Sequence, residues 1–332
     1  MKILVTGGCG YIGSHTCVSL LNNNYDVVIV DNLSNSKKDV IDKIKSITNK
    51  DLKFYKEDLC NVGKLDKIFD KEKPDAVIHF AGFKAVGESV KKPLMYYRNN
   101  LDSTISLLEV MNKHNCKKIV FSSSATVYGK PKKLPIKETF KTSTTNPYGT
   151  TKLMIESILN DLYISDNNWR IVILRYFNPI GAHPSGLLGE DPNGIPNNLM
   201  PYIVKVANKE LKELSVFGND YNTHDGTGVR DYIHVEDLAF GHIKALEKIN
   251  KSDGINVYNL GTGKGYSVLD IINTFKKVNN VDVPYKIVER RKGDIDSCYT
   301  SIEKAKKELD FVAKKNIEEM CRDSYNYVLK SK

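Results

Sequence analysis

The sequence predicts an α/β fold in which a doubly wound parallel sheet is joined to a smaller, mixed α/β domain. Three observations predict it. Short apolar runs typical of strands alternate with segments of helical period, a glycine-rich loop follows the first run, and the alternation loosens after about residue 177. Alternating strands and helices favour parallel pairing through crossover helices, so we expect helices on both faces of the sheet.

The strands of the first half are expected to be buried, because each is a continuous apolar run. In chain order they cover residues 3–5, 27–30, 53–55, 76–80, 119–121 and 171–174. The helices expected between them include residues 11–22, 101–114 and 152–165. Residues 179–201, rich in glycine and proline, read as a long irregular connection, with a turn at Pro192-Asn193-Gly194. Later helices are expected at residues 200–210, 235–249, 268–277 and 301–309.

Composition excludes several classes of protein. The 49 basic and 40 acidic residues give a net charge of +9, but the two kinds are interspersed, which indicates a solvated surface and no nucleic-acid partner. No apolar run reaches the ~18 residues of a membrane span, and the first strand follows Met1 too closely for a signal peptide. The six cysteines form no CxxC pair and the seven histidines no HExxH motif, so we expect a cytoplasmic protein without a metal.

The glycine-rich loop predicts a dinucleotide site. Gly7, Gly10 and Gly13 lie between the first strand and the first helix. Their spacing suits a tight turn, a close approach of backbone N–H groups to a pyrophosphate, and close packing of the helix on the strand. Asp31 ends the second strand 18 residues after Gly13, where a carboxylate bonds ribose hydroxyls and repels a 2′-phosphate. This Rossmann-type unit favours NAD, although Lys37 and Lys38 leave NADP open.

The domain boundaries follow from this assignment. We expect an NAD-binding Rossmann domain over residues 1–176 and a substrate-binding domain over residues 177–332, with a segment near 235–262 as a candidate to return to the first domain. A ligand crevice forms at the carboxyl ends of parallel strands. Residues at such ends are further candidates for the cofactor site: Asp58, Leu59, Phe80, Ala81 and Lys84.

Tyr148 and Lys152 are the candidates for catalysis. Their spacing of four residues places both side chains on one face of a helix, and Pro147 suits the start of that helix. A phenol has a pKa near 10, so it needs a nearby cation to act as a base around neutrality. Ser124, at the end of a strand, could hydrogen-bond a substrate hydroxyl, with Ser122 and Thr126 as the alternatives.

Six segments, from residue 6 to residue 294, carry a resemblance to a known family. The chain resembles the extended short-chain dehydrogenases/reductases, and within them the nucleotide-sugar 4-epimerases. The segments are TGGCGYIGSH (6–15), SSSATVYG (122–129), NPYGTTK (146–152), RYFNPIGA (175–182), DGTGVRDYIH (225–234) and RRKGD (290–294).

The resemblance implies a reversible epimerisation at C4 of UDP-hexoses, as in galactose metabolism. Tyr148 would take the proton of the 4-hydroxyl while tightly bound NAD takes the hydride, and the 4-keto sugar would turn over before the hydride returns. The expected substrate contacts, with two arginines on the diphosphate, are Ser124, Asn178, Asn198, Leu199, Phe217, Arg230, Tyr232, Arg291, Asp294 and Cys298. The expected cofactor contacts are completed by Tyr11, Ile12, Asn32, Asn99, Ser122, Tyr148, Lys152 and Phe177.

Two departures refine this expectation. Related 4,6-dehydratases place an acidic pair where this chain has Ala125 and Thr126, which disfavours a dehydratase. Cys298 stands where a bulky aromatic residue restricts the sugar pocket in some epimerases, so we expect UDP-GalNAc and UDP-GlcNAc to be accepted too. The alternatives are a UDP-glucuronate or UDP-pentose epimerase and a catalytically silent dinucleotide-sensing or regulatory protein. The family also suggests a homodimer formed by helices 101–114 and 152–165.

Overall fold

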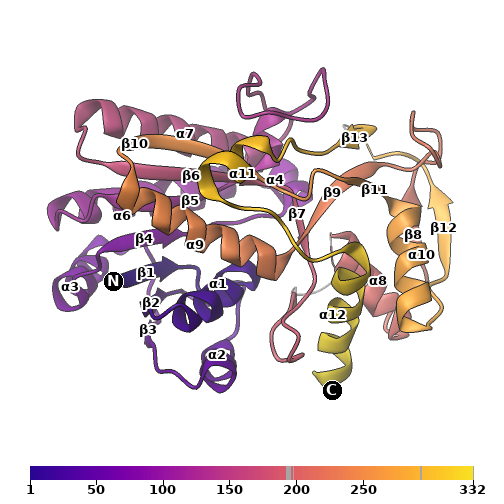
Figure 1. Cartoon of the computed structure of the whole chain (residues 1–332), viewed down its shortest axis with the longest axis horizontal. Coiled ribbons are helices and arrows are strands. Elements are labelled where there is room, and N and C mark those ends of the chain that lie inside the picture. Colours follow the sequence, from indigo (N-terminus) through magenta and orange to yellow (C-terminus); the bar gives the residue numbers. More distant parts are fainter. Residues whose placement is uncertain (192–195, 197, 292–293, 332) are drawn as a thin grey trace. The chain divides into compact units, whose positions relative to one another are not determined.

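The computed structural model describes residues 1–191, 196, 198–291 and 294–331, so the predicted turn at Pro192-Asn193-Gly194 lies outside the described residues. The chain divides into two units (Figure 1). The first comprises Met1–Gly129, Lys141–Tyr176 and Ala239–Tyr258, and the second comprises Lys130–Phe140, Phe177–Leu238 and Asn259–Lys332.

The first unit is built on a seven-stranded sheet with the order β10-β6-β5-β4-β1-β2-β3. Neighbouring strands from β6 to β3 pair in parallel, which confirms the predicted doubly wound architecture. The chain order reverses between β1 and β4, and ligand crevices form at such a reversal. The strands are β1 (Lys2–Thr6), β2 (Asp26–Val30), β3 (Lys53–Tyr55), β4 (Ala76–His79), β5 (Lys118–Ser124), β6 (Arg170–Tyr176) and β10 (Gly254–Leu260).

Helices connect these strands, as the alternation predicts. The predicted helix 101–114 is shorter, because a π-helical turn precedes it, whereas the helix predicted to begin at Pro147 does so, capped by the Asn146 side chain. The helical elements are α1 (Tyr11–Asn22), α2 (Val40–Thr48), α3 (Val62–Glu72), α4 (Val86–Lys91), α5 (Pro93–Tyr97), η1 (Arg98–Asp102), α6 (Ser103–Lys113), η2 (Ala125–Tyr128), α7 (Pro147–Ser165) and α9 (Val235–Lys251).

One face of the sheet packs on α3, α6 and α7. The strands contribute buried side chains such as Leu4, Val77 and Phe121, and α7 contributes Ile155 and Leu159. Successive side chains of a strand point to opposite faces, so continuous apolar runs supply both faces at once. This packing fixes α7 against β5 and β6, and α7 carries both Tyr148 and Lys152.

The second unit contains two small sheets. The first has the strand order β11-β9-β13, with β7 also paired to β9, and the second pairs β12 with β8. Sequence reasoning did not predict these short strands, nor α12, although a capping box of Asn316 and Glu319 marks its start. The elements are β7 (Asn178–Ile180), α8 (Leu199–Ala207), β8 (Leu214–Phe217), β9 (Val229–His234), β11 (Gly265–Ser267), α10 (Val268–Asn279), β12 (Tyr285–Val288), β13 (Ser297–Cys298), α11 (Glu303–Leu309) and α12 (Ile317–Lys330).

Among the helices of the described residues, none combines the length and the apolar character needed to cross a lipid bilayer.

A buried histidine in the first unit makes stability depend on pH. His79 is fully buried, bonded to Thr6 (2.7 Å) and Thr104 (2.9 Å), and burial, with Lys152 nearby, lowers its pKa to about 3. The unfolded chain takes up this proton near pH 6.5, so the unfolding free energy falls as pH drops below that value, by about 1.4 kcal/mol per unit. We expect urea unfolding to show this loss between pH 7 and pH 5, and His79→Gln to flatten it. An unchanged slope in the variant would refute the assignment.

Candidate active site

The glycine loop closes tightly over the end of β1. A Cβ atom on Gly13 would lie 2.3 Å from the carbonyl oxygen of Gly7, and one on Gly7 would lie 2.8 Å from the nitrogen of Ala81. Gly7 also has a φ of +68°, in the left-handed region that favours glycine. Gly10 precedes the first turn of α1 and offers no side-chain cap. No side chain caps the backbone N–H groups at the start of α1, so they are available to bind an anion such as a pyrophosphate.

Asp31 is held in a fixed orientation at the end of β2. Its carboxylate accepts hydrogen bonds from the backbone nitrogens of Cys9 (3.0 Å) and Leu33 (2.9 Å) and from the hydroxyl of Ser36 (2.9 Å). A carboxylate has about four acceptor positions, so capacity remains for a ribose hydroxyl. Asn32 donates to Asp58 (2.8 Å) beside it. The charge and the donor set of these residues fit the adenosine end of NAD.

The structure brings most of the other predicted cofactor residues into the first unit. Lys84 lies over the ring of Tyr11 at 5.8 Å, Ala81 donates to the hydroxyl of Thr6 (3.3 Å), and Asn99 donates to Asn100 (3.0 Å). Phe177 belongs to the second unit, where its backbone nitrogen donates to Leu260 (3.1 Å). Contacts between these residues and a dinucleotide remain predictions, as they do for Ile12, Leu59 and Phe80.

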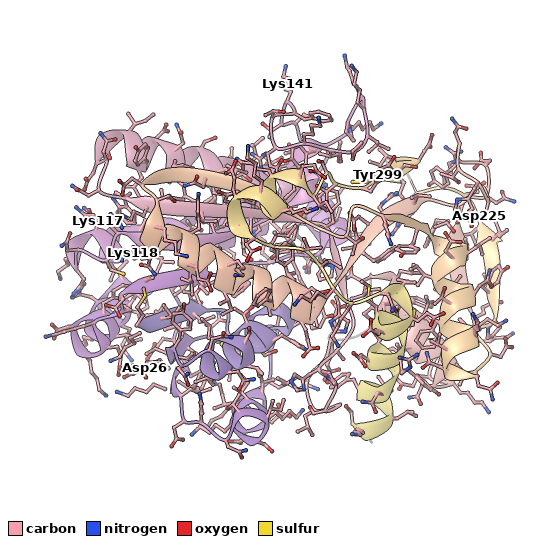
Figure 2. All side chains as sticks on the ribbon, in the orientation of Figure 1. Asp26, Lys117, Lys118, Lys141, Asp225 and Tyr299 are labelled. Carbon is pink, nitrogen blue, oxygen red and sulfur yellow. The ribbon has the colours of Figure 1, made fainter. Side chains whose placement is uncertain are left out.

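Tyr148, Lys152 and Ser124 come together at the carboxyl end of β5. Lys152 donates to the backbone carbonyl of Ser122 (2.7 Å), and its Nζ lies 6.0 Å from the centre of the Tyr148 ring. The Ser124 side chain lies near enough to Tyr148 to lower the pKa of its phenol, and its hydroxyl accepts from the Thr126 hydroxyl (3.0 Å). In Figure 2, the labelled residues Lys117 and Lys118 mark the opposite, amino end of this strand. The alternative Ser122 bonds Tyr176 instead (2.7 Å), so the geometry favours Ser124 as the partner of Tyr148.

Burial sets the ionisation of this pair. Burial lowers the pKa of Lys152 to about 8, and the Glu156 carboxylate partly offsets that change. Burial also raises the pKa of Tyr148 to about 12, and the nearby Ser124 side chain partly offsets that rise. A phenol with this pKa is not a base at neutral pH on its own. Tyr148 therefore requires additional positive charge close by, which a nicotinamide ring would supply.

In the second unit, the predicted substrate residues of opposite charge form a cluster. Arg291 contacts Asp294 (3.0 Å) and lies over the ring of Phe217 at 4.9 Å. Arg230 lies 3.7 Å from the same aspartate and donates to the carbonyl of Ile295 (2.9 Å). Two guanidinium groups that share one aspartate, one of them over an aromatic ring, form a suitable surface for a nucleoside diphosphate.

The remaining substrate candidates lie on strands and helix starts of this unit. Asn178 on β7 pairs with Tyr232 on β9, and Cys298 on β13 pairs with Arg230 on β9. Tyr232 is buried in the core of the unit, and its contact with the substrate stays a prediction. Two further candidates adjoin the start of α8: Asn198, whose side chain donates to Glu190 (3.0 Å), and Leu199.

Sequence reasoning missed a buried ionic network that joins α7 to the sheet. Glu156 and Arg175 form an ion pair of 2.5 Å, and Arg175 also donates to the Tyr128 hydroxyl (3.0 Å). The spacing of Glu156, four residues after Lys152, was a usable signal because it continues the same helix face.

Comparisons with known proteins agree with this geometry. A family model described as GDP-mannose 4,6 dehydratase matches residues 4–324, and it belongs to the extended short-chain dehydrogenase/reductase group. A UDP-glucose 4-epimerase of Bacillus subtilis is 60% identical over 98% of this chain and 96% of its own length. A UDP-glucose 4-epimerase of Pasteurella multocida is 55% identical over 100% of this chain and 98% of its own.

Solved structures give the same result. The crystal structure of UDP-glucose 4-epimerase from Bifidobacterium longum in complex with NAD⁺ and UDP has a TM-score of 0.96 and 55% identity, covering 99% of this chain and 98% of that one. The UDP-Glc/GlcNAc 4-epimerase of Campylobacter jejuni has a TM-score of 0.87 and 35% identity, covering 99% of both chains. The fold and the Tyr148–Lys152 helix thus define an extended short-chain dehydrogenase/reductase. Within that class, the chain belongs to the UDP-glucose 4-epimerase family.

Proposed function

We propose that this protein is an enzyme that interconverts UDP-galactose and UDP-glucose by reversible epimerisation at C4. The observation that carries the proposal is that Ser124, Tyr148 and Lys152 lie together at the carboxyl end of β5, in the same unit as a glycine loop that fits NAD. Curated relatives with 55–60% identity over nearly their whole length are named UDP-glucose 4-epimerases. Their names support the substrate class assigned here.

NAD is proposed to be a prosthetic group held by the first unit. The residues that would hold it are the loop glycines and Asp31, together with the further cofactor residues named above. When bound, NAD accepts the hydride from C4 of the sugar and returns it. Structures of neighbouring epimerases from Bifidobacterium longum and Brucella ovis are described with NAD, which supports this assignment. We propose residues 1–176 as the cofactor region, with the segment near residues 235–262 returning to it, and the rest of residues 177–332 as the substrate region.

Tyr148 is proposed to take the proton of the sugar 4-hydroxyl. Ser124, whose side chain lies near Tyr148, is proposed to orient that hydroxyl. Lys152 supplies a cation beside the phenolate, and the bond to the Ser122 carbonyl keeps its ammonium in place. Because no acid stands at Ala125 or Thr126, the chain offers no group there to eliminate water, which separates it from the dehydratases that gave the family model its name.

Epimerisation by the purified protein, with no NAD added, tests this proposal. One aliquot is denatured to measure released NAD, and another is incubated with UDP-galactose. We expect UDP-glucose to form and bound NAD to approach one per chain. Bound NAD without turnover of UDP-galactose would overturn the proposal. Because one relative in Pisum sativum is named as bifunctional for UDP-glucose and UDP-xylose, UDP-xylose serves as a further substrate in the same assay.

Acceptance of N-acetylated sugars is a separate part of the proposal, and it rests on Cys298. This side chain is small and half-buried on β13. We expect the protein to convert UDP-GalNAc, and Cys298→Tyr to reduce that conversion at least tenfold because the ring would occupy the space of the acetamido group. Turnover of UDP-galactose by the variant is the internal control. Equal losses on both sugars would contradict a role in selecting size.

A homodimer is proposed through the faces of α6 and α7. Ile105 on α6 and Met154 on α7 are large apolar side chains that are 42% and 44% exposed, as an interface between copies requires. Sedimentation velocity tests the dimer, and a single species of 37.4 kDa would refute it.

A cytoplasmic location is also proposed. The six cysteines are scattered along the chain and four of them are buried, as is typical of reduced thiols in a cytoplasmic protein.

A further inference from the structure

One face of α7 carries three ionisable side chains at a spacing of four residues: Tyr148, Lys152 and Glu156. All three are buried, with exposures of 8%, 5% and 7%. The proposed chemistry uses Tyr148 and Lys152 but assigns nothing to Glu156. A buried carboxylate is costly unless it is paired and hydrogen-bonded, so its partners indicate what it does.

Glu156 connects α7 to two neighbouring strands of the sheet. Its carboxylate accepts hydrogen bonds from the Ser123 hydroxyl on β5 (2.5 Å) and from the Nε (3.0 Å) and Nη2 (2.5 Å) of Arg175 on β6. Ser123 and Arg175 are direct partners in the register of these strands. A single carboxylate therefore fixes the helix to both strands, one turn after Lys152.

The same network extends toward Ser124. Arg175 donates to the hydroxyl of Tyr128 (3.0 Å), and its guanidinium lies 5.0 Å from the centre of that ring. Tyr128 belongs to η2, the short turn whose N-cap is Ser124. The network thus contacts the helix that bears Tyr148 and Lys152 as well as the turn that follows Ser124.

We propose that Glu156, anchored by Arg175, is a positioning residue of the active site that keeps Lys152 cationic and holds α7 in register with the strand end bearing Ser124. This inference rests on the proposed function, because it assigns a role in the same reaction. Glu156 acts through Lys152 and does not contact the substrate.

The charges around Lys152 support this role. The groups that face it or its neighbours are Tyr148 and Glu156 on α7, His79 on β4, Tyr96 on α5, Tyr128 on η2, and Arg175 and Tyr176 on β6. His79 is neutral, since burial lowers its pKa to about 3, and burial raises the pKa of Tyr96, Tyr148 and Tyr176. Glu156 is the carboxylate of this set, and it opposes the effect of burial on the pKa of Lys152.

The test compares Glu156→Gln, which removes the charge, with Glu156→Asp, which keeps it but shortens the side chain. Lysine labelled with ¹³C at Cε reports the titration of Lys152 in the NAD-loaded protein, and Lys152→Met assigns the signal. We expect the Gln variant to lower the pKa of Lys152 by about one unit and the Asp variant to leave it close to the wild-type value. The alkaline limb of the kcat profile should move with the titration, while KM changes less than about threefold.

Ser123→Ala is the matched control, because it removes a hydrogen bond to Glu156 without changing a charge. We expect no shift of the Lys152 titration in this variant. If Glu156→Gln does not fold, the double variant Glu156→Gln/Arg175→Met leaves no buried charge unpaired and should shift the titration in the same direction. An unshifted Lys152 in the folded charge-removing variant would overturn the proposal. If the wild type lacks epimerase activity, the proposed function fails while the titration still decides the role of Glu156.

Discussion

Tyr148→Phe is expected to lower kcat for UDP-galactose by about 10²–10⁴-fold, because it removes the phenol oxygen that takes the proton of the 4-hydroxyl. Phenylalanine keeps the ring, so the packing of α7 and the neighbouring position of Lys152 should persist. The variant should therefore retain its bound NAD and a melting temperature close to that of the wild type. The rate of UDP-glucose formation and the NAD released on denaturation are the two measurements.

Tyr163→Phe is the control for this variant, since it makes the same change on α7 two residues before the helix ends. Tyr163 is half-buried and lies beside Gly254, away from Ser124. We expect full activity in the control. If Tyr148→Phe retained more than about a tenth of the wild-type kcat, proton transfer by Tyr148 would be refuted.

Gly13→Ala is expected to abolish NAD retention. Its Cβ would lie 2.3 Å from the carbonyl oxygen of Gly7 and 2.9 Å from the Cα of Gly8, both of which are backbone atoms that cannot rotate away. The first turn of α1 must then move off β1, and the N–H groups that fit a pyrophosphate move with it. We expect the purified variant to carry less than about a tenth of the wild-type NAD and to unfold at a lower temperature.

Gly87→Ala provides the matched control on α4, where an added Cβ would meet no atom within 4 Å. Alanine stabilises a helix by up to about 1 kcal/mol relative to glycine, so this variant should be as stable as the wild type or more stable. Equal NAD contents in the two variants would show that the loop tolerates a side chain at position 13, and would contradict the role of Gly13.

The sequence predicted the first unit well because its signals are local. The apolar runs coincide with β1 to β6, and residues 11–22 form α1 as expected. The second unit was harder to predict, since β13 has two residues and β7 three, and each exists because it pairs with β9 from a distant part of the chain. Local patterns do not contain such pairings.

The residues of the candidate site also fall into two groups, those that local spacing predicts and those that depend on distant parts of the chain. The glycines and the Tyr148–Lys152 pair are recognisable from spacing, and the structure places them as that spacing requires. The role of Glu156 depends on Arg175, 19 residues later, and on Ser123, 33 residues earlier. Only the register of β5 and β6 brings these two donors to the same carboxylate.

The bond between Lys152 and position 122 has a consequence for mutagenesis. The acceptor is the main-chain carbonyl, which every amino acid supplies, so no substitution at this position can remove the acceptor. Substitutions at Ser122 would report its hydroxyl bond to Tyr176 instead. A scan of side-chain substitutions therefore cannot detect the hydrogen bond that anchors Lys152. Tolerance of substitutions at position 122 would say nothing about how strongly the carbonyl oxygen holds the Lys152 ammonium group.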